Sequence, residues 1–346
     1  MQINSLKLSN YRNHHRALFE FKDNLNIIIG NNGSGKTNIL ESIIVLSNTR
    51  SFRTANDLDL ILHKCDYGLV EAHTSEGKLR VVLNQKGKAL FIDDQPVKKT
   101  SQFIGHLNAI LFKPADIELF KDNPKERRRI LDLEIGKTDH RYLNCLYHYN
   151  LLLKDKNRLL KEEKIDNTYL DLLDEQMVPL IAVIIDKRQE FFDHLNSKIN
   201  SLYTSLSGKD AQLNLEYHPS YKIEEIATKM REGRDKDLYY HYVTTGPHHE
   251  DYRFNFLGYD INSIASQGQK RMVMIAFKLI IADYIYQKSQ KRPIILLDDI
   301  FSELDFDNQS RLLKNLPTAS QILITGTDIN GLCIAQKYNL IKLEGK

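Results

Sequence analysis

The chain has 346 residues, which is long for a single compact core and predicts a large domain with an appendage. Its composition, 42% hydrophobic and 27% charged, is that of an ordinary soluble globular protein. The formal net charge of +3 is too small to indicate a nucleic-acid partner. Any surface for DNA therefore has to come from local clustering of basic residues.

Cysteine usage and hydropathy indicate the cellular compartment of the protein. Cys65, Cys145 and Cys333 lie far apart and form no CxxC pair, which argues against a disulfide framework or a zinc site. The opening segment MQINSLKLSNYRN lacks the basic-then-apolar layout of a signal peptide. No apolar run approaches the roughly 18 residues that span a bilayer. We expect a cytoplasmic protein with no membrane partner.

Short strands joined by tight turns are predicted for the first third of the chain. The turn at Gln85–Lys88 contains Gly87, which suits a hairpin between two of these strands. The strand candidates are Ile3–Leu8, Leu25–Ile29, Lys78–Asn84, Ala89–Asp93 and Asn108–Phe112.

A helical stretch is predicted from about Pro124 to Leu206, where apolar residues recur three and four positions apart. Pro179 lies inside this pattern and predicts a kink or a helix boundary. Gly208 stands where a C-cap glycine is expected. The stretch is too short for the coiled coils of chromosome-organising ATPases, so we interpret it as a compact helical arm.

The last third returns to alternating helices and strands. Helices are predicted around Ile223–Met230 and over Gly268–Gln287. Ile294–Leu297 and Gln321–Thr325 are strongly apolar and indicate fully buried parallel strands.

Residues 30–37 read GNNGSGKT and fit the phosphate-binding pattern GxxxxGK[ST] between a predicted strand and a predicted helix, Thr37–Leu46. Glycines let backbone N–H groups converge on phosphate oxygens, and the helix N-terminus favours anions. Lys36 would reach the β- and γ-phosphates, and Thr37 would offer a hydroxyl to Mg²⁺. The alternative is an ordinary glycine-rich turn. The predicted ATP-binding residues are Gly30, Asn31, Asn32, Gly33, Ser34, Gly35, Lys36 and Thr37.

Two acidic residues follow the apolar strand Ile294–Leu297. A phosphate-binding loop needs a carboxylate for Mg²⁺ at the end of a buried strand. We assign Asp298 to Mg²⁺ and Asp299 to polarising the attacking water, with Lys36 as the third catalytic residue. Taken alone, this run indicates no more than a strand end.

The segments that flank Asp298 and Asp299 indicate the function of this acidic pair. SQGQ, which is Ser266, Gln267, Gly268 and Gln269, opens a predicted helix, and an SELD segment containing Ser302 and Asp305 follows the acids. In isolation SQGQ is an ordinary helix N-cap. In this order, the segments resemble the signature motif and the D-loop of ABC ATPases. In that family the signature of one subunit caps the γ-phosphate held by the other, so ATP holds a dimer together.

The spacing of the motifs indicates which branch of the ABC ATPases the chain resembles. Ser266 lies 230 positions after Lys36. This is about twice the separation in transporter ATPases, which indicates an insertion and the branch shared with SMC proteins. Further segments resemble the RecF family and cover nearly the whole chain: LKLSNYRNH, GNNGSGKTNILESI with RSFR after it, residues 112–132, TGPHHED, SQGQKR, LLDDIFSELD and ITGTD.

The resemblance implies an α/β fold: an ABC-type P-loop ATPase head with a mixed sheet, plus an inserted α-helical arm. We expect the head at 1–120 and 209–346 and the arm at 121–208. It also implies a head-to-head dimer that closes on ATP and Mg²⁺, clamps DNA, hydrolyses ATP weakly, and works with RecO and RecR to load RecA on gapped DNA.

Some positions depart from the expected motifs. His249 and Glu250 stand where the RecF family usually has Arg and Asp, which puts a role for that arginine in doubt. Asp299 replaces the usual glutamate of ABC proteins, and Thr327 and Asp328 occupy the region of their histidine. These last two features resemble RecF and suggest slow hydrolysis. For the γ-phosphate-sensing loop, the candidate is the turn Phe112–Asp116.

Five arginines are candidates for contact with duplex DNA or a duplex–single-strand junction: Arg50, Arg53, Arg127, Arg128 and Arg129. For the last three the alternative is a solvated helix face paired with Glu126 and Asp132. Arg53 could instead reach the γ-phosphate. Rival functions are a transport ATPase subunit, an SMC-type structural protein and a P-loop kinase.

Overall fold

The structure, a computed structural model, describes residues 1–121, 123–328 and 337–344. It contains two compact units, which we describe separately. The first unit comprises Met1–Ile117, Ser201–Asp210 and Ser266–Lys346, and the second comprises Glu118–Asn200 and Ala211–Ala265.

The first unit contains a parallel five-stranded sheet, with the strand order β14-β3-β13-β12-β8. All five residues of β12 are buried, as are all but the last of β13, which confirms the predicted buried parallel strands. The strands are β3 (Leu25–Gly30), β8 (Ala109–Phe112), β12 (Ile294–Asp298), β13 (Ile322–Gly326) and β14 (Tyr338–Leu343).

The second sheet of this unit is antiparallel, with the order β2-β1-β4-β5-β6-β7. The predicted hairpin around Gly87 is confirmed: Asn84 pairs with Gly87, whose φ of +119° would strain any other residue. The strands are β1 (Ile3–Tyr11), β2 (His14–Glu20), β4 (Tyr67–Thr74), β5 (Gly77–Asn84), β6 (Gly87–Ile92) and β7 (Gln95–Val97).

The helix α1 (Lys36–Asn48) packs against both sheets. Nine consecutive residues, Ile39–Ser47, are buried, because the helix has protein on all sides and one apolar core joins it to β1, β4, β5, β8 and β12. The other helices of this unit are η1 (Asp57–Leu60), α2 (Thr100–Phe103), α9 (Gln267–Ser289), η4 (Phe301–Glu303) and α10 (Phe306–Asn315), and η2 (Pro114–Phe120) ends in the second unit.

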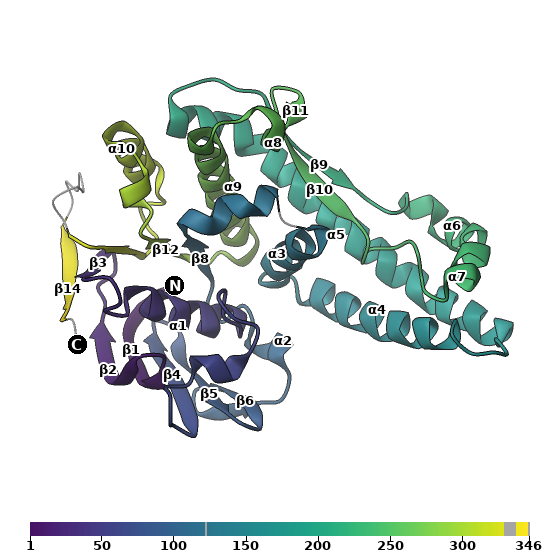
Figure 1. Ribbon diagram of the computed structural model, residues 1–346, viewed down its shortest axis with the longest axis horizontal. Helices are drawn as coiled ribbons and strands as arrows, with labels where there is room; N and C mark the ends of the chain where they lie inside the picture. The colour runs from purple at the N-terminus through teal and green to yellow at the C-terminus, as the bar shows by residue number, and fades with distance from the viewer. Residues whose placement is uncertain (122, 329–336, 345–346) are drawn as a thin grey trace. The chain divides into compact units, whose positions relative to one another are not determined.

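The second unit is mainly helical (Figure 1). The predicted helical stretch is three helices, and α5 continues through Pro179, so a helix boundary there is wrong. Gly208 ends α5 in the left-handed conformation, with φ +69° and its N–H bonded to Thr204 at 2.8 Å. The elements are α3 (Pro124–Gly136), α4 (His140–Leu159), α5 (Asn167–Ser207), β9 (Leu213–His218), η3 (Ile223–Glu225), α6 (Ile226–Glu232), α7 (Arg234–Tyr240), β10 (Asp251–Phe256), β11 (Tyr259–Asp260) and α8 (Ile261–Ile264).

The compact units group the chain differently from the expected head and arm. Ala211–Ala265 belongs with the helices, because β9 is bound to α5 through Asn196 and Asn200, whose side chains bond to Leu215 and Leu213. The assignment of head and arm domains stays a prediction. Cys65 and Cys145 are free thiols, and Cys333 lies outside the described residues. None of the described helices combines the length and apolarity that crossing a membrane requires.

Candidate functional site

The GNNGSGKT segment forms an open cradle between β3 and α1. Gly33 and Gly35 have φ of +84° and +101°, which only glycine adopts without strain. A Cβ at Gly33 would meet nothing within 4 Å, so the loop leaves space above it. The N-cap Gly35 gives α1 no side-chain cap, and its first turn has no acidic residue. The first N–H groups of the helix are therefore available to an anion.

Lys36 lies folded over this loop. Its Nζ donates to Gly30 O at 2.6 Å and to Asn31 O at 3.1 Å, so the ammonium group stands among the backbone groups that line the cradle. The hydroxyl of Ser34 is buried and has no hydrogen-bond partner in the structure. A buried orphan hydroxyl and a cation beside an open helix N-terminus fit a polyphosphate.

Asp298 is the last residue of β12, at the carboxyl edge of the parallel sheet. Its Oδ1 accepts hydrogen bonds from Thr37 Oγ1 at 3.0 Å and from Thr325 Oγ1 at 2.9 Å. Burial raises the pKa of this carboxyl group, which is only 8% exposed. A hydroxyl and a carboxylate this close suit Mg²⁺, which takes few protein ligands when phosphate oxygens complete its shell. The predicted residues thus fit ATP with Mg²⁺.

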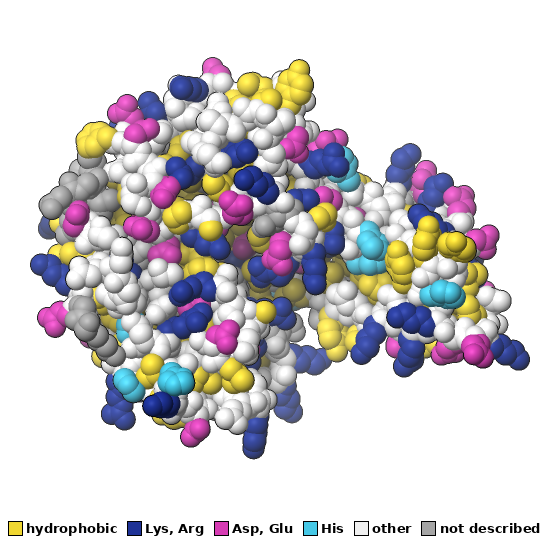
Figure 2. Space-filling view, viewed as in Figure 1, with side chains coloured by type: hydrophobic (Ala, Val, Ile, Leu, Met, Phe, Trp, Pro, Cys, Tyr) yellow, Lys and Arg dark blue, Asp and Glu magenta, His cyan; other side chains and the backbone are white. Residues whose placement is uncertain are grey.

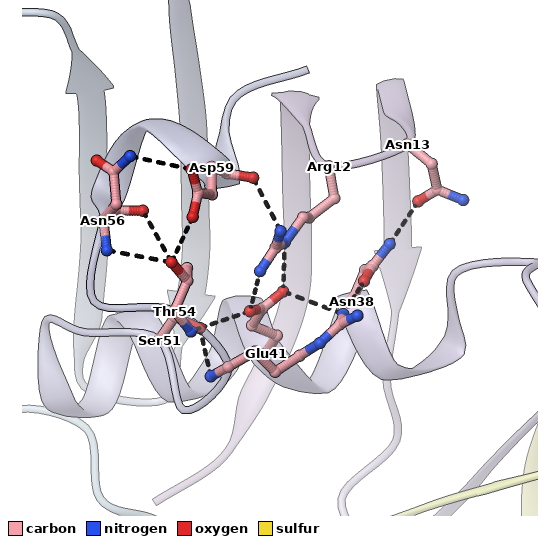
Figure 3. A network of polar contacts seen from close by, with 9 residues as sticks. Arg12, Asn13, Asn38, Glu41, Ser51, Thr54, Asn56 and Asp59 are labelled. Carbon is pink, nitrogen blue, oxygen red and sulfur yellow. Dashed lines mark hydrogen bonds and ion pairs between the residues drawn. The ribbon is translucent and has the colours of Figure 1, made fainter. Parts of the chain in front are cut away.

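A buried carboxylate that the sequence analysis did not single out organises the loop after α1 (Figure 3). Glu41 is fully buried and accepts from Arg12 twice, at 2.8 and 2.6 Å. Ser51 Oγ donates to the same carboxylate at 2.5 Å, and Arg53 Nη1 lies 3.7 Å from it. The only signal in the sequence was an acid inside the apolar run ILESIIVL, on a helix with no exposed face there.

This network reaches the cradle through amide side chains. Arg53 Nη1 donates to Asn38 at 2.8 Å, and Asn38 donates to Asn13 at 2.8 Å (Figure 3). Atoms of Asn13 would lie within about 3 Å of a Cβ at Gly35, so this side chain lies against the loop. Arg53 therefore stands beside the candidate nucleotide site, and Arg50 is exposed on the same connection.

The SQGQ segment begins the long helix α9. Ser266 is its N-cap: Ser266 Oγ accepts from Gln269 N at 3.3 Å, and Gln269 Oε1 accepts from Ser266 N at 2.8 Å. Ser266, Gln267 and Gly268 are exposed, and a Cβ at Gly268 would meet nothing within 4 Å. The N–H groups of Gln267 and Gly268 are open to solvent at a helix start, as a second anion site requires.

The SELD segment lies between the acidic pair and α10. Ser302 Oγ donates to Asp299 O at 2.7 Å, which ties the segment to the end of β12. Asp305 is the N-cap of α10 and accepts from Asn308 N at 2.8 Å. Arg271, on the helix that SQGQ opens, donates to Glu303 O at 2.7 Å. Helix α9 and the SELD segment are thus bonded to one another.

The turn Phe112–Asp116, the candidate sensing loop, contains no glutamine. Its acid, Asp116, accepts from Lys113 N at 2.7 Å and forms an ion pair with Lys278 of α9. These contacts occupy Asp116 within the chain. The assignment of this turn as the γ-phosphate-sensing loop stays a prediction.

The three consecutive arginines lie on α3 in the second unit, and two of them bind residues at the start of β10 or directly before it. Arg127 forms a bidentate ion pair with Asp251, with both bonds at 2.7 Å. Arg128 Nη1 donates to Glu250 O at 2.6 Å, and burial lowers the pKa of Arg128. Arg129 is about half exposed and pairs with Glu126. This pairing is the one expected for a solvated helix face. Of the three, Arg129 has the most freedom to meet DNA.

Of the two departures from the family pattern, His249 and Glu250, only Glu250 lies in a buried polar network. Glu250 is 3% exposed and accepts from Arg188 at 2.5 Å and from Tyr217 OH at 2.5 Å. Arg188, 1% exposed, also donates to Asp132 at 2.8 Å. Glu250 is therefore a structural counterion in this chain, whereas His249 is exposed.

We expect His248 to make the second unit sensitive to acid. Burial, followed by the neighbouring His249, lowers the pKa of His248 from 6.5 to about 4. Between these values the unfolded chain binds the proton and the folded chain does not, so stability falls as the pH falls from 6.5 towards 4. We expect His248→Phe to reduce the slope of unfolding free energy against pH in this window, by at most about 1.4 kcal/mol per pH unit. Urea unfolding at several pH values measures it.

The control for this prediction is His63→Gln, which removes an exposed histidine. A slope that is the same in wild type and His248→Phe would mean that His248 gains its proton without loss of stability.

Comparison with known proteins places this geometry in a family. A family model described as RecF/RecN/SMC N terminal domain matches residues 2–343. The chain is 34% identical to DNA replication and repair protein RecF of Staphylococcus carnosus (strain TM300), over 96% of this chain and 95% of that protein. It is 35% identical to the protein of that name from Bacillus subtilis (strain 168), with the same coverage.

Solved structures agree with this result. A structure described as the recombination mediator protein RecF-ATP in the RecFOR pathway has a TM-score of 0.88 and 30% identity, covering 95% of this chain and 94% of that one. A structure of an SmcHead bound to the C-winged helix domain of ScpA has a TM-score of 0.55 at 16% identity, which supports the shared fold alone. The predicted resemblance and fold class are confirmed, and the chain belongs to the RecF family of DNA replication and repair proteins.

Proposed function

We propose that this protein is an ATP-dependent DNA-binding protein of recombinational gap repair, in which two copies close head to head on ATP and Mg²⁺ and clamp DNA. Slow hydrolysis then releases the clamp. The observation that carries the proposal is a pair of open helix N-termini: one in the phosphate cradle before α1, and one at the SQGQ start of α9.

The length of α9 supports a site shared between two chains. Lys278, midway along this helix, donates to Leu111 O at the end of β8. Ser266 lies twelve residues closer to the helix start, which is about 18 Å beyond that point at 1.5 Å per residue. The cradle follows β3, three strands away from β8 in the sheet. The signature N-terminus is therefore suited to a phosphate held by a second copy.

Within one site, each predicted residue has a separate task. The backbone of 30–37 and Lys36 bind the phosphates, and Thr37 with Asp298 would hold Mg²⁺, which neutralises charge on the phosphate oxygens. Asp299 orients and polarises the attacking water. Arg53, held beside the cradle through Asn38, is suited to the γ-phosphate.

The DNA contact is electrostatic in this proposal. Figure 2 shows Lys and Arg side chains interleaved with acidic ones on the face drawn. Exposed arginines such as Arg50 and Arg129 would each contact the DNA backbone. RecO and RecR are the proposed partners, and loading of RecA the proposed outcome, because the related structures belong to the RecFOR pathway by their descriptions.

The test is the mass in light scattering, with and without Mg-ATP and a gapped duplex, at several salt concentrations. We expect a monomer that becomes a dimer with ATP, stays on DNA while ATP lasts, and binds DNA more weakly as salt rises. A monomer under all conditions would favour a simple P-loop enzyme such as a kinase. Binding that does not change with salt would overturn the electrostatic contact.

A further inference from the structure

Thr325 connects the two acidic residues of the candidate site. It belongs to β13, which lies between β3, the strand before the cradle, and β12, the strand that ends in Asp298. Its side chain is 1% exposed. In the register of the sheet, Thr325 is opposite both Asp298 and Ile28. A polar side chain at this point of a buried strand requires hydrogen-bond partners.

The hydroxyl of Thr325 has two partners in the site. Its Oγ1 donates to Asp298 Oδ1 at 2.9 Å. The same oxygen accepts from the backbone N–H of Asp299 at 3.0 Å. The Thr325 proton points to Asp298 Oδ1, which is nearer than the other acceptor, Leu297 O at 3.4 Å, and the oxygen lone pairs face the N–H of Asp299.

The backbone at Asp299 needs such support. Its φ is +54°, in the left-handed region that non-glycine residues adopt at a cost. This conformation turns the chain sharply after β12 and thereby sets the direction of the Asp299 carboxylate. A hydrogen bond to the N–H of a residue with such a backbone fixes that direction from a rigid neighbouring strand.

We propose that Thr325 is a positioning residue that holds Asp299 in its left-handed conformation, so that its carboxylate is directed at the attacking water. This inference rests on the proposed ATPase function and assigns a role to a residue outside the phosphate-binding, signature and acidic motifs. Thr325 touches neither the phosphates nor the water in this proposal, and it acts through Asp299.

The test is Thr325→Val, which keeps the branched shape and removes the hydroxyl. We expect kcat for ATP to fall by about 10- to 100-fold, because a small misplacement of a catalytic group has an effect of this size. KM for ATP and the Mg²⁺ concentration for half-maximal rate should change by less than about 3-fold, because Thr37 still donates to Asp298. Binding of a fluorescent ATP analogue should persist. Thr325→Ser should stay within about 3-fold of wild type.

The double variant with Asp299→Asn tests whether Thr325 acts through Asp299. Once Asp299→Asn has removed the carboxylate, adding Thr325→Val should lower kcat no further. A full additional loss in the double variant, a large shift in the Mg²⁺ requirement, or failure of Thr325→Ser to restore kcat would each overturn the inference. Failure of wild type to bind or hydrolyse ATP would overturn the proposed function itself, which is a different outcome.

Discussion

Ser266→Arg should abolish the ATP-dependent dimer while each chain still binds nucleotide. Ser266 is exposed at the start of α9, about 18 Å along that helix from the level of Leu111, so an arginine there does not crowd the cradle of its own chain. In the proposed dimer it would instead fill the place where the N–H groups of Gln267 and Gly268 would meet a phosphate of the second copy. We expect a monomer mass in Mg-ATP by light scattering, and a nucleotide dissociation constant within about 2-fold of wild type.

Two variants separate this effect from damage to the helix. Ser266→Ala removes the N-cap and costs about 1 kcal/mol of stability without adding bulk, so it should keep some ATP-dependent dimer. Ser197→Arg places the same side chain on an exposed position of α5 and should dimerise like wild type. ATP-dependent dimers of Ser266→Arg with wild-type affinity would exclude the split site.

How much of the fold and of the site the sequence predicts depends on how far apart the interacting residues lie in the chain. The phosphate-binding segment and the buried strand before Asp298 were predictable, because a local pattern of glycines or apolar residues determines them. The parallel partners of these strands are distant in the sequence: β3 pairs with β13 nearly 300 residues later, and no local pattern specifies that pairing. The fold class was predicted from the family resemblance, because related proteins share the same pairing of distant strands.

The parts of the site that went unpredicted depend on side chains from different elements. Glu41 was hidden because a charged residue in an apolar helix gives no indication of its partner, and that partner, Arg12, follows β1. Thr325 was hidden inside a run of strand residues. Continuation of α5 through Pro179 shows the reverse case: buried residues before the proline (Met177) and after it (Ile181) hold the helix by tertiary packing, which overrides the intrinsic effect of proline.

Glu41→Gln should produce the largest loss of stability among the site variants. Glu41 is fully buried, accepts hydrogen bonds from Arg12 and Ser51, and lies 3.7 Å from Arg53 Nη1, so the amide leaves two guanidinium groups without this charged partner. Removing one member of a buried ion pair is strongly destabilising, and the amide keeps part of the hydrogen bonding. We expect the free energy of unfolding in urea to fall by about 2–4 kcal/mol. Nucleotide affinity should also weaken, because Arg53 and Asn38 lose their fixed position beside the cradle.

The matched control is Glu126→Gln, which neutralises a glutamate that is 41% exposed and paired with the similarly exposed Arg129. Its cost should stay below about 0.5 kcal/mol, because water replaces the lost partner at the surface. If Glu41→Gln were equally mild, the Arg12 guanidinium, whose side chain is 19% exposed, would have to reach solvent in the folded protein, and the loop that carries Arg53 would not depend on the buried carboxylate. A stability loss with unchanged nucleotide affinity would separate the two roles and leave Glu41 as a purely structural counterion.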